Sequence, residues 1–244
     1  MPISEVGHAR NIASFEQMIS IVTGFGPTYN PSNSNISVSK LNNKFVAANN
    51  ANDAVQADFA GKTTAINIRE NAFKPLGPTS TKAVNYYAST GTEQNKVEDV
   101  KTLNRKLQGT RKAPAVPDDP ATPVDESKQS ISASQQSYTQ KVEHLEGMIQ
   151  LFSDDPLYNP NETAITIASL TTLAADLKQA TSDVINSITA FNNARIERNT
   201  VMYHPTTGLY KLAMMVKQYV KSLYGASSPE NKMVSKLKFR NEEM

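Results

Sequence analysis

The chain contains an internal repeat, and this feature constrains its fold more than any other. Phe15-Glu-Gln-Met-Ile19 recurs as Leu145-Glu-Gly-Met-Ile149, and Tyr29-Asn-Pro31 recurs as Tyr158-Asn-Pro160. A polar turn and an Ile-x-Val/Ile-x-x-Leu pattern follow each Tyr-Asn-Pro motif, formed by Ile36, Val38 and Leu41 and then by Ile165, Ile167 and Leu170. Because these matches keep the same order along the chain, we expect two related units, residues 1–109 and 138–244.

The segment between the repeats is rich in proline. It holds Pro114, Pro117, Pro120 and Pro123 at three-residue spacing, with acidic residues around them and a Ser/Gln-rich stretch after them. Proline at this density disfavours helix and sheet pairing and favours extended polyproline II. We interpret residues 110–137 as a semi-rigid linker between the units. The alternative interpretation is a proline-rich motif that binds an SH3-like groove.

Apolar residues at helical spacing predict one long helix in each unit. In the second unit they follow steps of three and four, close to a coiled-coil seam. The seam comprises Leu170, Leu173, Leu177, Ala180, Val184, Ile188 and Phe191. The first unit repeats the pattern with Val38, Leu41, Phe45, Ala48, Val55, Phe59 and Ile66. Pro75 and Pro205 limit these helices, and a ~40-residue helix would be about 60 Å long.

Two asparagines have predicted roles in the long helices. Asn52 takes a core-type position, where a polar residue can fix register or partner at a cost in stability. The alternative is that Asn52 lies at the rim of a wider bundle, and this is the interpretation that we favour. Asn161 is predicted to cap the second long helix.

Shorter helices are expected before and after the long ones. They are Ala9–Thr23, Ser137–Phe152, Leu209–Tyr224 ended by Gly225, and a short helix that starts after Ser228. Strand signals are weak. Neither long helix can bury its apolar stripe alone, so we expect the two to pack together. The predicted fold is all-α, an elongated helical bundle of two tandem, internally duplicated units with two long central helices. Whether the units form one bundle or two domains is left open.

The inventory of reactive residues argues against an enzyme. The absence of cysteine excludes disulfides, thiolate metal sites and cysteine nucleophiles. The histidines are far apart and lack metal-ligand spacing; they are His8, His144 and His204. We expect His204, which precedes a proline, to have a role in a turn, and Asp154 and Asp155 to be solvated turn residues. We therefore expect no enzyme, no metal, no cofactor and no small-molecule substrate.

The N-terminal residues and the apolar runs bear on the compartment. The chain has no apolar run of the ~20 residues that span a bilayer. Its first residues include Glu5, His8 and Arg10 and lack the apolar stretch of a secretory signal. The expectation is a cytoplasmic protein.

Positive charge is concentrated near the C-terminus. The net charge is +2, yet residues 205–240 hold seven basic side chains against Glu230. The candidate partner-binding residues are Lys211, Lys217, Tyr219, Lys221, Lys232, Lys236, Lys238 and Arg240. Interleaved Lys and Tyr suit nucleic acid or an anionic partner, and a basic amphipathic helix suits an anionic membrane. The interpretation that we favour is that the helix Leu209–Tyr224 packs in the core and exposes its lysine face to solvent.

These patterns together predict a class of function. Long helices and polar turns provide surface rather than a pocket, so we expect a non-enzymatic scaffold or protein-interaction bundle. Self-association or a protein partner in a larger assembly follows from that expectation. The alternative is nucleic-acid or anionic-surface binding through residues 205–240.

Overall fold

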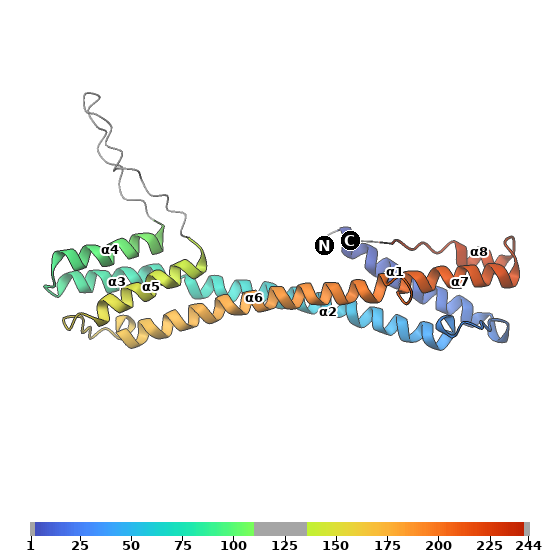
Figure 1. Cartoon of the computed structure of the whole chain (residues 1–244), viewed down its shortest axis with the longest axis horizontal. Coiled ribbons are helices and arrows are strands. Elements are labelled where there is room, and N and C mark those ends of the chain that lie inside the picture. The colour runs from blue at the N-terminus through green and yellow to red at the C-terminus, as the bar shows by residue number, and fades with distance from the viewer. Residues whose placement is uncertain (1–2, 110–135, 242–244) are drawn as a thin grey trace, which may run out of the picture. The chain divides into compact units, whose positions relative to one another are not determined.

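The computed structural model describes residues 3–109 and 136–241, and every regular element in these ranges is helical (Figure 1). The first range holds α1 (Ile3–Gly24), α2 (Val38–Phe73), α3 (Leu76–Ser89) and α4 (Gln94–Gln108). The second holds α5 (Tyr138–Ser153), α6 (Ile167–Tyr203), α7 (Leu209–Tyr224) and α8 (Pro229–Ser235). Short 3-10 turns are η1 (Gly26–Thr28), η2 (Ser34–Ile36) and η4 (Thr163–Ile165). The all-α prediction is confirmed, whereas the prolines of the predicted linker lie outside the described residues.

The two long helices begin at hydroxyl caps. The Ser37 hydroxyl accepts a hydrogen bond from the Lys40 backbone N–H over 3.4 Å, and the Thr166 hydroxyl accepts one from that of Ser169 over 3.2 Å. Such caps satisfy N–H groups that have no partner inside the helix. The prediction that Asn161 caps the second long helix is wrong, because α6 begins at Ile167 and a 3-10 turn precedes it. At 36 and 37 residues, α2 and α6 are slightly shorter than expected.

A tight turn redirects the chain from α6 into α7. The His204 ring nitrogen Nδ1 accepts hydrogen bonds from the backbone N–H groups of Thr206 and Thr207, both over 3.3 Å. A Cβ at Gly208 would lie 2.4 Å from the backbone nitrogen of His204 and 2.6 Å from its carbonyl oxygen. The turn therefore requires glycine at this position, and His204 has the turn role that its position before a proline indicates.

The chain forms two compact units, and each unit draws on both halves of the sequence. Within the described ranges, unit 1 comprises residues 3–62 and 187–241, and unit 2 comprises residues 63–109 and 136–186. Helices α2 and α6 each contribute one part to each unit. The boundaries of the compact units thus differ from the bounds 1–109 and 138–244 expected from the sequence, because helices from either side of the proline-rich segment cover one another's apolar faces.

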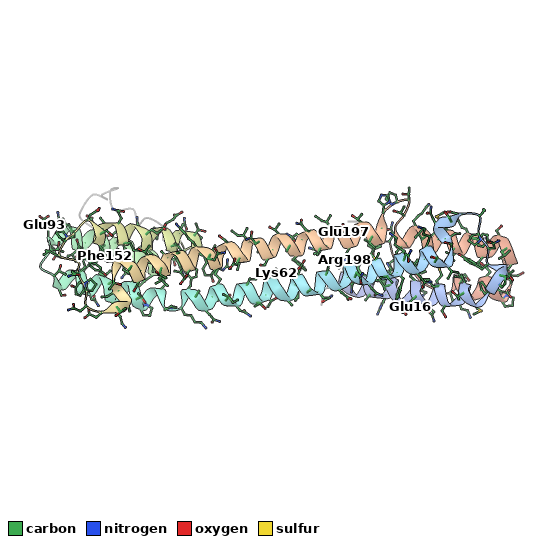
Figure 2. All side chains as sticks on the ribbon, turned by 90° about the horizontal axis from the view of Figure 1, so that it is seen from below. Glu16, Lys62, Glu93, Phe152, Glu197 and Arg198 are labelled. Carbon is green, nitrogen blue, oxygen red and sulfur yellow. The ribbon has the colours of Figure 1, made fainter. Side chains whose placement is uncertain are left out.

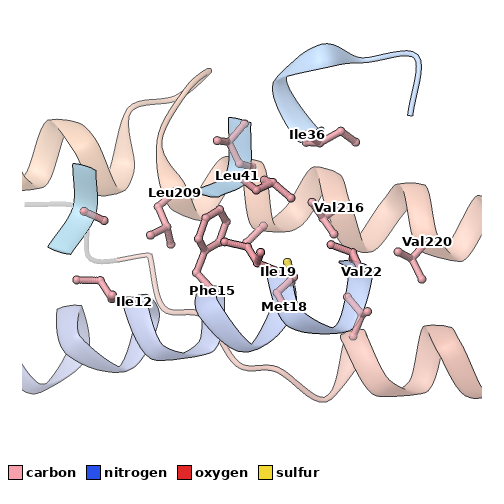
Figure 3. Packing of buried hydrophobic residues seen from close by; sticks show 14 of the residues in the cluster. Ile12, Phe15, Met18, Ile19, Val22, Ile36, Leu41, Leu209, Val216 and Val220 are labelled. Atoms are coloured by element: carbon pink, nitrogen blue, oxygen red, sulfur yellow. The ribbon is translucent and has the colours of Figure 1, made fainter. Parts of the chain in front are cut away.

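The core of unit 1 lies between α1, α7 and the first part of α2 (Figure 3). Phe15 and Met18 on α1 are fully buried and belong to the same cluster as Leu41 of α2 and Val216 of α7. Their spacing of three along α1 places Phe15 and Met18 on one face of that helix. This face of α1 therefore packs into the core of unit 1.

The core of unit 2 lies where α4 packs on α5 (Figure 1). Val100 of α4 is fully buried with Leu145 of α5, and Leu177 of α6 belongs to the same cluster. Phe152 stacks on Tyr158, with ring centroids 4.1 Å apart. The core of unit 2 is thus formed by helices that precede the proline-rich segment and helices that follow it.

The two units share a local arrangement around a buried tyrosine. The Tyr29 hydroxyl donates to the Ile36 carbonyl oxygen over 2.7 Å, and the Tyr158 hydroxyl donates to that of Ile165 over 2.7 Å. Each tyrosine also meets a second one edge-on: Tyr219 for Tyr29 and Tyr86 for Tyr158, at centroid distances of 5.3 and 5.4 Å. Burial raises the pKa of both Tyr29 and Tyr158 above the ordinary value. These phenols therefore act as neutral hydrogen-bond donors.

Candidate protein-interaction surface

Two residues of the predicted seam are exposed. Phe59 is 51% exposed and Ile188 is 39% exposed, although both were expected to be buried. In unit 1 no side chain is buried in residues 56–62 of α2 or in residues 187–197 of α6. The apolar spacing predicts which face of a helix is apolar, but it does not predict how far the covering helices extend. The seam prediction is therefore wrong at Phe59 and Ile188.

Phe59 belongs to a cluster of rings and cations on unit 1. Its ring centroid lies 5.8 Å from that of Phe191 on α6, with the ring planes tilted by 56°. The Lys62 ammonium lies 4.9 Å from the Phe59 centroid and 4.2 Å from that of Phe191. The Arg195 guanidinium lies 5.6 Å from the Phe191 centroid. We call Phe59, Lys62, Ile188, Phe191 and Arg195 the aromatic surface; Lys62 marks it in Figure 2.

The aromatic surface contains phenylalanine and arginine, which are enriched at protein interfaces, together with lysine, which is depleted there. Aromatic residues and arginine are enriched at interface centres, and they carry much of the binding energy there. Cations above ring faces are attracted by the ring quadrupole. Ile196, at 59% exposure, adds apolar area further along α6, about 80° around the helix from Ile188. The arrangement can bind an apolar or acidic protein face.

Charged side chains continue along α6 from the aromatic surface (Figure 2). Arg198 is buried, and its Nη2 donates to the side-chain oxygen of Asn199 over 3.3 Å. Burial lowers the pKa of the Lys44 ammonium on α2, and the negative charge of Glu197 partly opposes that effect. The aromatic surface therefore borders charged residues of α6 as well as the exposed Ile196.

The side chains of two predicted partner-binding residues contact other residues of unit 1. The Lys217 ammonium donates to the Leu237 carbonyl oxygen and lies 5.3 Å from the centroid of the Phe239 ring. Burial lowers the pKa of Lys217. Tyr219 packs edge-on against Tyr29. The other predicted residues are exposed, namely Lys211, Lys221, Lys232, Lys236, Lys238 and Arg240.

Asn11 holds the backbone of the C-terminal segment against α1. Its side-chain amide donates to the Arg240 carbonyl oxygen over 2.8 Å, and its side-chain oxygen accepts from the Arg240 N–H over 2.9 Å. The same amide lies 3.2 Å from the Tyr203 hydroxyl, which is 2.8 Å from the His8 ring nitrogen Nδ1. An asparagine inside a helix gives no signal for this distant contact, so sequence reasoning missed it.

The environment of Asp155 differs from the solvated turn that we expected from the sequence. Asp155 is buried in unit 2 and accepts hydrogen bonds from the hydroxyls of Thr92 and Tyr87 and from the Leu157 backbone N–H. These donors, with Thr92 the strongest contributor, lower the pKa of the carboxyl to about 2. The expectation of a solvated turn residue is wrong because α3 and the turn after it supply two hydroxyl donors.

Three further features of the described residues concern metal ions, membranes and pockets. No group of three or more His, Cys, Asp or Glu residues among them could hold a metal ion. No described helix combines the length and apolar character needed to cross a membrane. An open hollow of about 530 Å³ in unit 2 has one charged side chain, Lys141, among its lining residues.

Comparison of the chain with protein families, curated proteins and solved structures finds no match. Its function has to be inferred from its residues and their geometry.

Proposed function

We propose that this chain is a non-enzymatic scaffold or protein-interaction protein that takes part in a larger assembly through the aromatic surface. The observation that carries the proposal is the half-exposed ring of Phe59, which lies beside Phe191 and the Lys62 ammonium. Fully burying an exposed phenylalanine side chain contributes roughly 1.5–3 kcal/mol, so covering the exposed half of Phe59 would contribute about half as much. A protein partner or a second copy that covers Phe59 and Ile188 therefore gains stability on binding.

The test compares two exposed positions of α2 in unit 1. Helical geometry places Ala57 about 200° around the helix from Phe59, so Ala57→Glu is a matched control for Phe59→Glu. Ile188→Glu tests the α6 side of the surface. We expect Phe59→Glu and Ile188→Glu to weaken partner capture or self-association about tenfold or more, since interface centres carry most of the affinity.

Light scattering and affinity capture with mass spectrometry supply the measurements. Circular dichroism of each variant checks that the helices remain. Binding that is unchanged in both surface variants would contradict the proposal, and so would equal losses in Ala57→Glu and Phe59→Glu.

We also propose that the two repeats are copies of one ancestral helical unit. Supporting this are the equal hydrogen bonds of Tyr29 and Tyr158, each to a carbonyl seven residues later. The hydroxyl caps at Ser37 and Thr166 add a second correspondence. Both pairs are separated by 129 residues in the sequence.

A second candidate function is binding of nucleic acid or an anionic membrane through residues 205–240. The observation in its favour is the exposure of Leu223 and Met233 on helices that also bear exposed lysines. Lys217 is unsuitable for a test because it holds the Leu237 carbonyl. The triple variant Lys221→Glu, Lys236→Glu and Lys238→Glu should abolish salt-sensitive binding to DNA or to anionic vesicles. Equal binding by the triple variant and the unmodified chain would exclude this candidate.

A further inference from the structure

We propose that residues 3–109, the first half, and residues 136–241, the second half, are binding partners that assemble without a covalent link. The opposite half of a second copy of this chain would fit each half equally well. This inference is independent of the aromatic surface, because it concerns the buried faces of the two units.

Neither half contains a complete core. In unit 1 the buried apolar cluster takes nine residues from the first half and seven from the second (Figure 3). In unit 2 the cluster takes seven from the first half and nine from the second. Because each cluster combines residues of both halves, separating the halves would expose apolar side chains in both units at once.

Polar contacts also join the halves in each unit. In unit 1 the Asn11 side chain pairs with both backbone groups of Arg240. In unit 2 the Tyr87 hydroxyl donates to Asp155 over 2.8 Å. Buried polar groups cost free energy when they lose their partners, so these contacts specify the opposite half in addition to the apolar packing.

The helix packing follows the same division. Helix α1 of the first half packs on α7 of the second, and α4 of the first half packs on α5 of the second. Within a half, α3 contacts α4 and α7 contacts α8. A separated half would therefore keep a helix pair but lose the helices that cover it.

In the intact chain, the first half is expected to pair with the second half of the same chain rather than with that of another copy. The Gln136 side-chain amide donates to the Lys106 carbonyl oxygen over 2.6 Å, so the second half starts beside the end of the first. A covalent link makes the second binding event intramolecular and raises the effective concentration. Exchange between copies is thus expected after the link is cut and the halves are released, because the interface residues are the same in every copy.

The test starts from the folded, full-length chain. A protease recognition sequence is inserted between Pro120 and Ala121, and the purified protein is cut there. We expect the two halves to elute together at the mass of the uncut chain and to keep its helical circular dichroism. Cut halves that elute separately, each with cooperative unfolding, would overturn the proposal and show that the repeats are independent domains.

A second step tests the exchange between copies. A cut preparation labelled with nitrogen-15 is mixed with an unlabelled one, unfolded in urea and refolded. We expect native mass spectrometry to find the two mixed pairings as abundant as the two unmixed ones. Refolding to unmixed pairings alone, or failure of the halves to pair again, would contradict the proposal.

Variants on neighbouring positions of α1 provide the matched control. Phe15 is fully buried in the cluster shared by the halves, whereas Glu16 is exposed. In the cut protein, Phe15→Ala should weaken association of the halves about tenfold or more, and Glu16→Gln should leave it unchanged. Equal association in both variants would count against the shared core. If the uncut Phe15→Ala variant does not fold, Val100→Ala takes its place, because Val100 is fully buried in the core of unit 2.

Discussion

The Tyr29 hydroxyl donates a 2.7 Å hydrogen bond to the carbonyl oxygen of Ile36 and thereby fixes the turn that leads into α2. Tyr158 makes the same bond to Ile165 ahead of α6. Both bonds are buried, so neither carbonyl can exchange its partner for water without opening the turn. The entry into each long helix thus depends on one phenol.

The first prediction concerns these two phenols. Tyr29→Phe and Tyr158→Phe should each lower the free energy of unfolding by about 1–3 kcal/mol, because each leaves a buried carbonyl without its donor. Urea unfolding followed by circular dichroism measures the loss. Tyr210→Phe is the control, since its hydroxyl makes no hydrogen bond to any described residue. Losses that are no larger than that of the control would contradict the structural role of the phenols.

The second prediction concerns acid stability. The pKa of Asp155 is about 2 in the folded protein, below its ordinary value of 3.8. The ionised carboxylate therefore contributes stability at neutral pH, and this contribution is lost as the pH falls from about 4 towards 2. Asp155→Asn should be less stable than the unmodified chain at pH 7, and the difference should shrink in that window.

Thermal unfolding at several pH values measures this difference. At pH 7 the exposed neighbour gives a control, because Asp154→Asn should cost less stability than Asp155→Asn. A difference between Asp155→Asn and the unmodified chain that stays constant down to pH 2 would show that the carboxylate charge is not involved.

The third prediction compares two glycines. A Cβ at position 208 would collide with the backbone of His204, whereas one at position 61 on α2 would meet no atom within 4 Å. Gly208→Ala should therefore destabilise the protein by more than about 1 kcal/mol. Gly61→Ala should stabilise it by roughly 0.5–1 kcal/mol, since glycine inside a helix costs backbone entropy. Equal urea midpoints for the two variants would contradict the described turn.

The fourth prediction concerns the C-terminal segment. Asn11→Ala removes both hydrogen bonds to the Arg240 backbone and should let trypsin cut at Lys236 and Lys238 faster. Mass spectrometry of a limited digest follows the cleavage. Asn42→Ala is the control, because that side chain bonds within α2, to Val38. Cleavage at the same rate in both variants would mean that Asn11 does not hold the segment.

Much of the fold could be predicted from local signals in the sequence. Proline and glycine positions indicate where helices end, and α7 has the predicted bounds Leu209–Tyr224. Apolar spacing identifies the buried faces, as at Leu170 and Leu177. These signals act over one or two helical turns, which is why they can be recognised in a single sequence.

The rest depends on contacts between distant residues. Spacing cannot show that helices from opposite halves of the chain cover one another, as α4 and α5 do. It also cannot show that Thr92 and Tyr87 meet Asp155, or that Phe59 remains half exposed among the described residues. The aromatic surface was missed for this reason, because Phe59 and Phe191 have the spacing of ordinary core residues.

Site-specific photo-crosslinking tests the proposed function most directly. Benzoylphenylalanine replaces Phe59 in one variant and Ala57 in another, and each is irradiated in an extract of the cells that produce the protein. We predict that position 59 crosslinks to a defined protein or to a second copy of the chain, whereas position 57 does not. Equal crosslinking at the two positions, or none at position 59, would contradict the proposal that the aromatic surface binds a protein.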